Sequence, residues 1–285
     1  MIVVSDTAAL EAHLTALRDH ARRVAFVPTM GNLHDGHLAL VNQARAAADA
    51  VVVSIFVNPM QFAENEDLDT YPRTLDDDLN ALREAGVDLV LTPSVDDIYP
   101  DGSAAHTAIH VPGLGDALCG KDRPGHFDGV CTVVYKLFQL VGPDVAVFGE
   151  KDLQQLLIIK KMVGDLGLPI DIQSGPTQRA EDGLALSSRN QYLSASERAV
   201  APLLRQTLQS CGAALTATPD GPPTSIIDPA RKALERAGFT VDYLELRELA
   251  TLQLVDRMDQ DCALFVAARL GETRLIDNIQ LAARA

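Results

Sequence analysis

Short apolar runs rich in β-branched residues alternate with helix-like segments along the first 175 residues. The run from Val51 to Val57 is almost continuously apolar, as a strand buried on both faces of a sheet should be. Further strands are predicted at 24–27, 88–91, 145–148 and 170–172, and helices at 37–48, 75–85, 131–141 and 153–166. This alternation predicts an α/β domain with a parallel sheet covered by helices.

The pattern changes beyond about residue 176. Helices are predicted at 194–215 and 229–237, with an exposed loop rich in Pro and Gly at 216–223 between them. Short strands follow at 241–246, 263–268 and 273–276. We therefore expect two domains, an α/β domain at 1–175 and a smaller α+β domain at 176–285.

Composition and charge narrow the possible functions. Hydrophobic residues make up 47% of the chain, which supports a packed core. The net charge of −15 argues against binding to nucleic acid or to anionic membranes, both of which need basic surface. We see neither a signal peptide nor a membrane span. The four cysteines are scattered, which favours a reducing compartment such as the cytoplasm.

The most informative polar segment is PTMGNLHDGH at 28–37, between the first predicted strand and the helix after it. His34 and His37 are three residues apart, so they share one face of a first helical turn. Helix N-termini attract anions, and two imidazoles there could donate hydrogen bonds to a reacting phosphate. Chance, or half of a zinc site, is the alternative, although no CxxC pair supports zinc.

Two other polar segments follow predicted strands. Asn58 and Gln61 carry amides that suit a small polar substrate, or that cap a Pro turn. Gly149 allows close approach of a ligand, Lys151 can pair with phosphate, and Asp152 can accept from ribose hydroxyls. A solvated charged turn is the alternative for this second segment.

Two loops carry further candidate anion ligands. One loop contains Ser187, Ser188 and Arg189, whose side chains could donate hydrogen bonds to a polyphosphate. The alternative is an ordinary helix-capping loop. Arg123 and His126 could meet an anion, although a role in fixing their loop is slightly favoured.

Three consecutive aspartates, 76–78, open the predicted helix at 75–85. Their carboxylates could hold Mg²⁺. Acidic residues in a first turn are also favoured by the helix dipole, and that interpretation has the greater weight.

Taken together and in this order, the segments resemble pantoate–β-alanine ligases (pantothenate synthetases) from end to end. The matching segments are PTMGNLHDGH (28–37), SIFVNPMQF (54–62), RPGHFDGV (123–130), VFGEKDLQQL (147–156), LALSSRN (184–190) and LGETRLIDN (270–278). The resemblance implies a Rossmann-like domain of the HxGH nucleotidyltransferase superfamily, a smaller C-terminal lid and a homodimer. It implies that ATP, accompanied by Mg²⁺, activates pantoate as an adenylate. Pyrophosphate leaves in this first step. β-Alanine then reacts with the adenylate to give pantothenate and AMP.

The resemblance also implies roles for individual residues. The implied catalytic residues are His34, His37, Lys151 and Arg189, and His37 would be a proton donor. Pantoate and β-alanine are held by Asn58, Gln61 and Gln155. The implied ATP site comprises Met30, Gly31, Asn32, Leu33, His34, Asp35, Gly36, His37, Gly149, Glu150, Lys151, Asp152, Gln178, Leu186, Ser187, Ser188 and Arg189. Position 178 is commonly aliphatic in the family, so Gln178 keeps a backbone contact with adenine and weakens apolar packing.

Three alternative functions remain at this point. A nucleotidylyltransferase that makes a dinucleotide cofactor shares the HxGH turn, but Gln61 and Gln155 suit a neutral polyol acid better than a phosphate acceptor. An aminoacyl-tRNA synthetase fragment is disfavoured by the net charge of −15. A non-catalytic nucleotide-binding module would not need the phosphate-binding set of Lys151, Ser187, Ser188 and Arg189.

Overall fold

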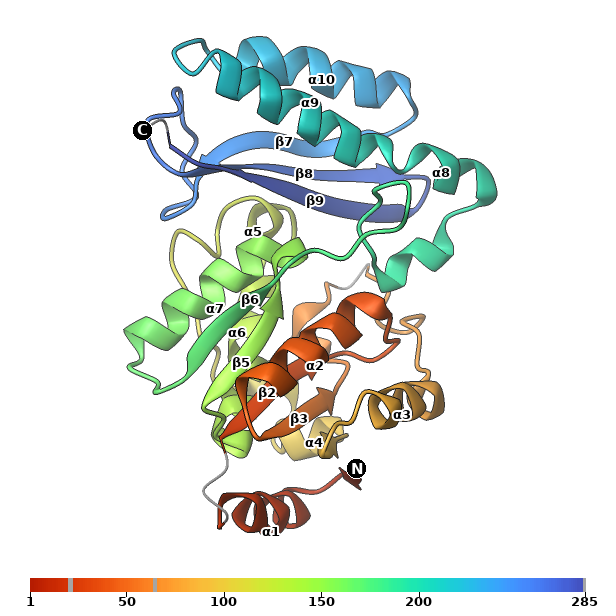
Figure 1. The fold of residues 1–285 in the computed structure, drawn as a ribbon, viewed down its shortest axis with the longest axis vertical. Helices are drawn as coiled ribbons and strands as arrows, with labels where there is room; N and C mark the ends of the chain where they lie inside the picture. Colours follow the sequence, from red (N-terminus) through yellow and green to blue (C-terminus); the bar gives the residue numbers. More distant parts are fainter. Residues whose placement is uncertain (20–22, 64–65, 284–285) are drawn as a thin grey trace.

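The structure is a computed structural model that describes residues 1–19, 23–63 and 66–283. Its larger sheet is parallel throughout, as predicted, with the strand order β1-β4-β3-β2-β5-β6 (Figure 1). The strands are β1 (Ile2–Val4), β2 (Val24–Thr29), β3 (Ala50–Ile55), β4 (Leu89–Leu91), β5 (Val145–Gly149) and β6 (Asp171–Gly175).

Helices cover both faces of this sheet, because alternate residues of each strand point to opposite sides. In β2, Phe26 packs into a core shared with α1, α6 and α7, whereas Ala25 and Val27 pack into a second core with α2 and α3. The helices are α1 (Thr7–Arg18), α2 (Asp35–Ala47), α3 (Leu75–Glu84), α4 (Val95–Ile98), α5 (Cys119–Asp122), α6 (His126–Val141) and α7 (Leu153–Asp165). Short 3₁₀ turns are η1 (Pro59–Gln61), η2 (Ser103–Ala105), η3 (Glu150–Asp152) and η4 (Ser188–Tyr192).

The position of β2 in the sheet determines where a ligand can bind. From β2 the chain continues to β3 on one side, and it later returns to β5 on the other. In such open sheets a crevice forms at the carboxyl ends of the strands where the order reverses. Helix α2, whose N-cap is His34 and whose first turn contains His37, starts at this point.

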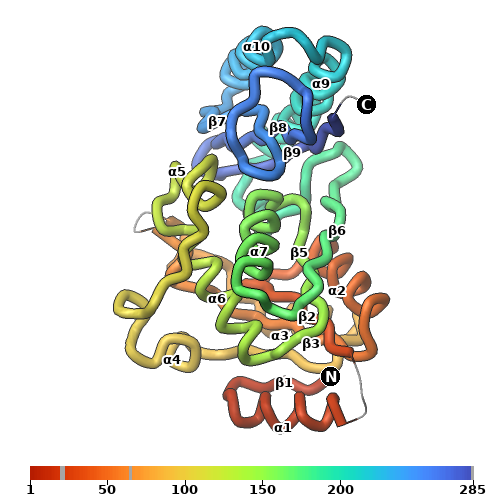
Figure 2. Tube along the Cα trace, turned by 90° about the vertical axis from the view of Figure 1, so that its left-hand side faces the viewer, coloured from red at the N-terminus to blue at the C-terminus, as the bar shows by residue number. Residues whose placement is uncertain are grey.

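The C-terminal part is a three-stranded antiparallel sheet covered on one face by helices. It comprises β7 (Thr240–Glu248), β8 (Cys262–Leu270) and β9 (Thr273–Leu281), with α8 (Ala195–Val200), α9 (Leu203–Ala217) and α10 (Thr224–Arg236). Helices α9 and α10 lie on the outer face (Figure 1). Tyr243, Phe265 and Ala267 on the opposite face join the apolar core of the first part, so this sheet packs directly above α7 and β5 (Figure 2).

Several predicted boundaries were wrong. Neither β1 nor α1 was predicted from the sequence. The predicted helix 194–215 is two helices, because the chain turns at Ala201 and Pro202. Helix α9 extends to Ala217 into the predicted loop, and α10 starts at Thr224 with Pro229 inside it. Helix α6 starts at His126, five residues before the predicted start.

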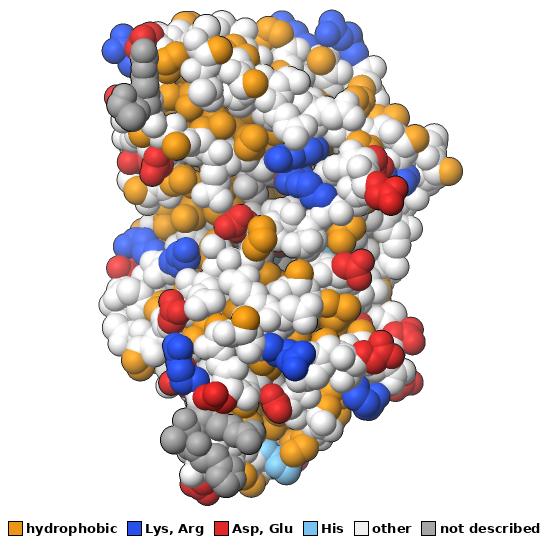
Figure 3. Space-filling model, viewed as in Figure 1, with side chains coloured by type: hydrophobic (Ala, Val, Ile, Leu, Met, Phe, Trp, Pro, Cys, Tyr) orange, Lys and Arg blue, Asp and Glu red, His pale blue; other side chains and the backbone are white. Residues whose placement is uncertain are grey.

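Charged side chains of both signs lie on the surface. On the face shown in Figure 3, basic side chains are interspersed with acidic ones over both parts of the molecule. Within the described residues, no helix has both the length and the apolar character needed to cross a bilayer.

Candidate active site

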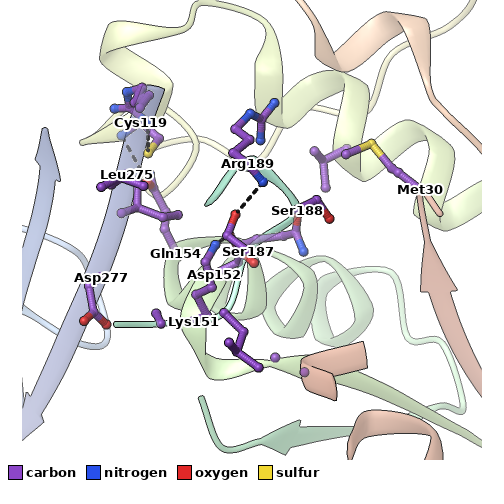
Figure 4. A pocket seen from close by; sticks show the side chains of 18 of the residues that line it. Met30, Cys119, Lys151, Asp152, Gln154, Ser187, Ser188, Arg189, Leu275 and Asp277 are labelled. Carbon is purple, nitrogen blue, oxygen red and sulfur yellow. Dashed lines mark hydrogen bonds and ion pairs between the residues drawn. The ribbon is translucent and has the colours of Figure 1, made fainter. Parts of the chain in front are cut away.

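A cavity of about 680 Å³ lies between the carboxyl ends of β2 and β5 and the C-terminal sheet. Met30 and Cys119 lie on opposite sides of it, with Lys151, Asp152 and Ser187 between them (Figure 4). The predicted site residues that line the cavity are Met30, His34, Gly36, His37, Asn58, Gln61, Gly149, Lys151, Asp152, Gln155, Gln178, Leu186, Ser187, Ser188 and Arg189.

The two histidines are held by the start of α2. The Nδ1 atom of His34 accepts a hydrogen bond from the Gly36 N–H at 3.1 Å, and Nδ1 of His37 accepts from the His34 N–H at 3.3 Å. Their ring centroids are 4.1 Å apart. A Cβ at Gly36 would lie 2.7 Å from Cε1 of His34, so a glycine there leaves room for the ring.

Burial and nearby charge determine whether the two rings are protonated, and the hydrogen bonds to Nδ1 determine which nitrogen carries the proton. Burial, followed by the charge of Lys151, lowers the pKa of His34, and burial, followed by His34, lowers the pKa of His37 to about 3. Both rings are therefore neutral near pH 7. Because each Nδ1 is an acceptor, the proton lies on Nε2. The pair thus offers two neutral N–H donors at the cavity.

Asp78 holds the turn that leads to the histidines. Its buried carboxylate accepts from the backbone N–H groups of Asn32 and Leu33 at 2.9 and 2.8 Å. Gly31 and Asn32 both have positive φ, so this turn is a constrained conformation that Asp78 stabilises. Asp78 is thus buried and occupied with the turn. This role differs from both sequence interpretations of the aspartates, the solvated first turn favoured by the helix dipole and the magnesium site.

Five residues of the implied ATP site are not part of the cavity lining. Gly31, Asn32 and Leu33 form the turn held by Asp78, and Asp35 is an exposed residue in the first turn of α2. Glu150 presents its backbone carbonyl to the C-terminal sheet.

Asn58 has no spare hydrogen-bonding atoms for a substrate. Its Oδ1 accepts from the Tyr99 hydroxyl at 2.8 Å and from the Met60 N–H, and its Nδ2 donates to the Gly129 carbonyl and to Oε1 of Gln61 at 3.1 Å. The side chain is 1% exposed. Asn58 therefore lines the cavity and orients Gln61 through this contact.

Gln61 and Gln155 are better placed to bind a substrate. The contact from Asn58 occupies Oε1 of Gln61 and turns its Nε2 toward Sδ of Met30, 3.0 Å away at the cavity wall. The amide of Gln155 also lines the cavity and makes no hydrogen bond with any other described residue. Gln61 thus presents a donor, and Gln155 can act as donor and acceptor.

Arg123 and His126 bind the chain segment that contains Gln61 and Glu66. His126 donates from Nδ1 to the Gln61 carbonyl at 2.8 Å, and its Nε2 accepts from Arg123. Arg123 forms an ion pair with Glu66. Burial, followed by the charge of Arg123, lowers the pKa of His126 to about 4. This agrees with the structural role that was slightly favoured for the pair.

The 187–189 segment closes another wall of the cavity. Ser187 caps η4 by accepting from the Arg189 N–H (Figure 4), and Ser188 donates to the Asn32 carbonyl at 3.0 Å. The guanidinium of Arg189 pairs with Asp67 through two hydrogen bonds. The segment therefore lies against the turn that precedes the histidines.

A further part of the cavity wall is the turn at residues 149–152. Lys151 lies 3.5 Å from its neighbour Asp152 and is 20% exposed. The backbone carbonyls of Glu150 and Lys151 accept from Asn278 of β9. Asp78 and Asn278 have structural roles at the site that sequence analysis did not assign, although Asn278 ends the matching segment LGETRLIDN.

Comparison with known proteins agrees with this geometry. A family model described as pantoate-beta-alanine ligase matches residues 2–280. The chain belongs to the pantoate–β-alanine ligase family. The resemblance seen in the sequence is thereby confirmed, together with the α/β fold and the enzyme class.

Full-length ligases of this family resemble the chain closely. It is 56% identical over 279 residues to the pantothenate synthetase of Chromohalobacter salexigens, covering 98% of both chains. The crystal structure of pantothenate synthetase from Thermus thermophilus superposes with a TM-score of 0.90 at 45% identity, covering 98% of this chain and 99% of that one. A ligase from Francisella tularensis, crystallised with beta-gamma ATP and beta-alanine, gives 0.82 at 35% identity, covering 98% and 97%.

Proposed function

We propose that this cavity condenses pantoate with β-alanine at the expense of ATP, through a pantoyl-adenylate. The observation that carries the proposal is the meeting in one cavity of two neutral imidazole donors, two cationic side chains and two substrate-facing amides. Family membership favours this reaction over the three alternatives that the sequence left open.

In the first step a pantoate carboxylate oxygen attacks the α-phosphorus of ATP, and pyrophosphate leaves. The difficulty is the approach of two anions. The Nε2–H groups of His34 and His37, with Lys151 and Arg189, would stabilise the negative charge on the transferring group. Gln61 and Gln155 would orient pantoate, with Gln61 donating to one of its oxygens.

In the second step the neutral amine of β-alanine attacks the acyl carbon, loses a proton, and AMP leaves with the C–O bonding electrons. The adenylate would hydrolyse in open water. We assign residues 1–175 to the catalytic domain and 176–285 to a lid. The direct packing of the C-terminal sheet over the cavity supports this assignment.

Mg²⁺ would accompany ATP and reduce the charge of its phosphates. No three acidic, His or Cys side chains of the described residues are grouped to hold a metal. This fits Mg²⁺ held mainly by phosphate and water oxygens. We also propose a homodimer, testable by analytical ultracentrifugation, and a cytoplasmic location, which the four buried free thiols support.

The deciding experiment separates the two steps. Pantoate-dependent exchange of labelled pyrophosphate into ATP should occur without β-alanine, and AMP release with pantothenate formation should need all three substrates. Exchange that required β-alanine would rule out a free-standing adenylation step. AMP release independent of pantoate would contradict the assigned substrate.

A further inference from the structure

One strand of the C-terminal sheet touches both segments that line the phosphate end of the cavity. Asn278 of β9 donates from its Nδ2 to the Glu150 carbonyl at 2.9 Å and to the Lys151 carbonyl at 3.1 Å. It is 8% exposed. Both N–H groups of its amide are therefore used to hold the turn that carries Lys151.

The preceding residue of β9 holds the other segment. Asp277 is 5% exposed and pairs with Arg179 through two hydrogen bonds of 2.7 and 2.8 Å. Arg179 pairs with Ala185 in an isolated antiparallel bridge. This hairpin runs directly into the segment 187–189.

Asp277 also supports its neighbour. One oxygen of its carboxylate accepts from the Asn278 backbone N–H at 2.8 Å. Figure 4 shows Asp277 on β9 beside the part of the cavity that contains Lys151. Two consecutive buried residues of the C-terminal sheet thus connect two walls that come from distant parts of the sequence.

We propose that Asn278 is a positioning residue for nucleotide binding, which places the Lys151 ammonium by holding the backbone of its turn. Asp277 supports Asn278 by accepting from its backbone N–H. It also aligns the 187–189 segment through its ion pair with Arg179. Because the contact spans the two sheets, Lys151 is correctly placed only when the C-terminal sheet lies over the cavity. This inference rests on the proposed contact between Lys151 and phosphate.

The chemistry of the amide gives a clear contrast between two variants. Asn278→Ala removes two donors and should weaken ATP binding roughly 5- to 30-fold. Asn278→Asp has nearly the same shape but turns a carboxylate oxygen toward two carbonyl oxygens. It should weaken ATP binding more than the alanine variant, by roughly 50-fold or more. The Kd for pantoate should change less than about twofold in the alanine variant.

A double-mutant cycle tests whether Asn278 acts through Lys151. The Kd for ATP is measured by isothermal titration calorimetry in the wild type, Asn278→Ala, Lys151→Ala and the double variant. Measuring binding instead of turnover keeps all four proteins comparable. If Asn278 places the ammonium, its substitution should change the Kd less than about twofold once Lys151 is already alanine.

Gln280→Ala is the matched control, because Gln280 is exposed on the same strand. It should leave the Kd for ATP unchanged. Equal losses from Asn278→Ala in both backgrounds, or no loss in either, would overturn the inference. A wild type that binds ATP without supporting pantoate-dependent exchange would instead contradict the proposed function. Circular dichroism melting of each variant identifies one that does not fold, and Asn278→Ser, which keeps one donor, then replaces the alanine variant.

Discussion

The carboxylate of Asp67 accepts two hydrogen bonds from the guanidinium of Arg189, at 3.1 Å from Nε and 2.8 Å from Nη2. The planar fork of Arg189 is the geometry that also matches a phosphate. Both side chains are about a quarter to a third exposed, at 24% and 30%. A nucleotide phosphate would therefore have to compete with Asp67 for the same donors.

We predict that Asp67→Asn lowers the KM for ATP by about two- to fivefold, because a partly exposed ion pair contributes roughly 0.5–1 kcal/mol. Initial rates at saturating pantoate and β-alanine provide the measurement. Asp69→Asn, an exposed change in the same loop, is the control. A raised KM for ATP would mean that Asp67 prepares Arg189 for phosphate instead of competing for it.

His37→Ala should reduce the rate of pyrophosphate exchange about 100-fold, as expected for the loss of one transition-state donor. His13→Ala provides the comparison, because α1 lies at the far end of the molecule from the cavity (Figure 1). An exchange rate within about threefold of the wild type would remove His37 from the mechanism.

The low pKa of His37 also predicts how stability depends on pH. The folded protein keeps the ring neutral down to about pH 3, whereas the unfolded chain takes up a proton near pH 6.5. Below pH 6.5 the unfolded state therefore binds more protons, and stability falls as the pH is lowered toward 3. The slope for one such group approaches about 1.4 kcal/mol per pH unit.

Urea unfolding at pH 7 and pH 4.5 would measure this dependence. His37→Asn should lose less stability over that interval than the wild type does. His126, whose pKa is lowered to about 4, adds a similar term that is present in both proteins and cancels in the difference. Identical losses in both proteins would show that His37 titrates normally.

Two adjacent glutamines should behave differently. Gln155 faces the cavity with an unengaged amide, so Gln155→Ala should raise the KM for pantoate about tenfold and leave the KM for ATP within about twofold. Gln154 is 6% exposed and donates to the Leu114 and Ala117 carbonyls. Gln154→Ala should instead lower the free energy of unfolding by about 1–3 kcal/mol. Equal changes in both KM values for Gln155→Ala would contradict its assignment to pantoate.

Much of this molecule follows from local sequence. The strands β2, β3 and β5 could be predicted because short apolar runs rich in β-branched residues are typical of strands buried on both faces of a sheet. The turn before α2 could be predicted from Gly31, because glycine permits a positive φ. The two histidines at helical spacing then indicate where the helix begins. Breaks such as that between α8 and α9 were missed, because the helical periodicity continues past Pro202 while the chain bends to pack.

The sequence by itself determined the alternation of strands and helices, the parallel sheet and several of the short segments that line the cavity. Those features depend on periodicity and on residue type, both of which are local. Only the tertiary structure decided that Asn58 serves Gln61, that Asp78 holds a backbone turn, and that Asn278 reaches across to Lys151. Each of these roles depends on which donor meets which acceptor in the folded chain. The contact of Asn278 with the Lys151 turn also needs the two sheets to be packed together.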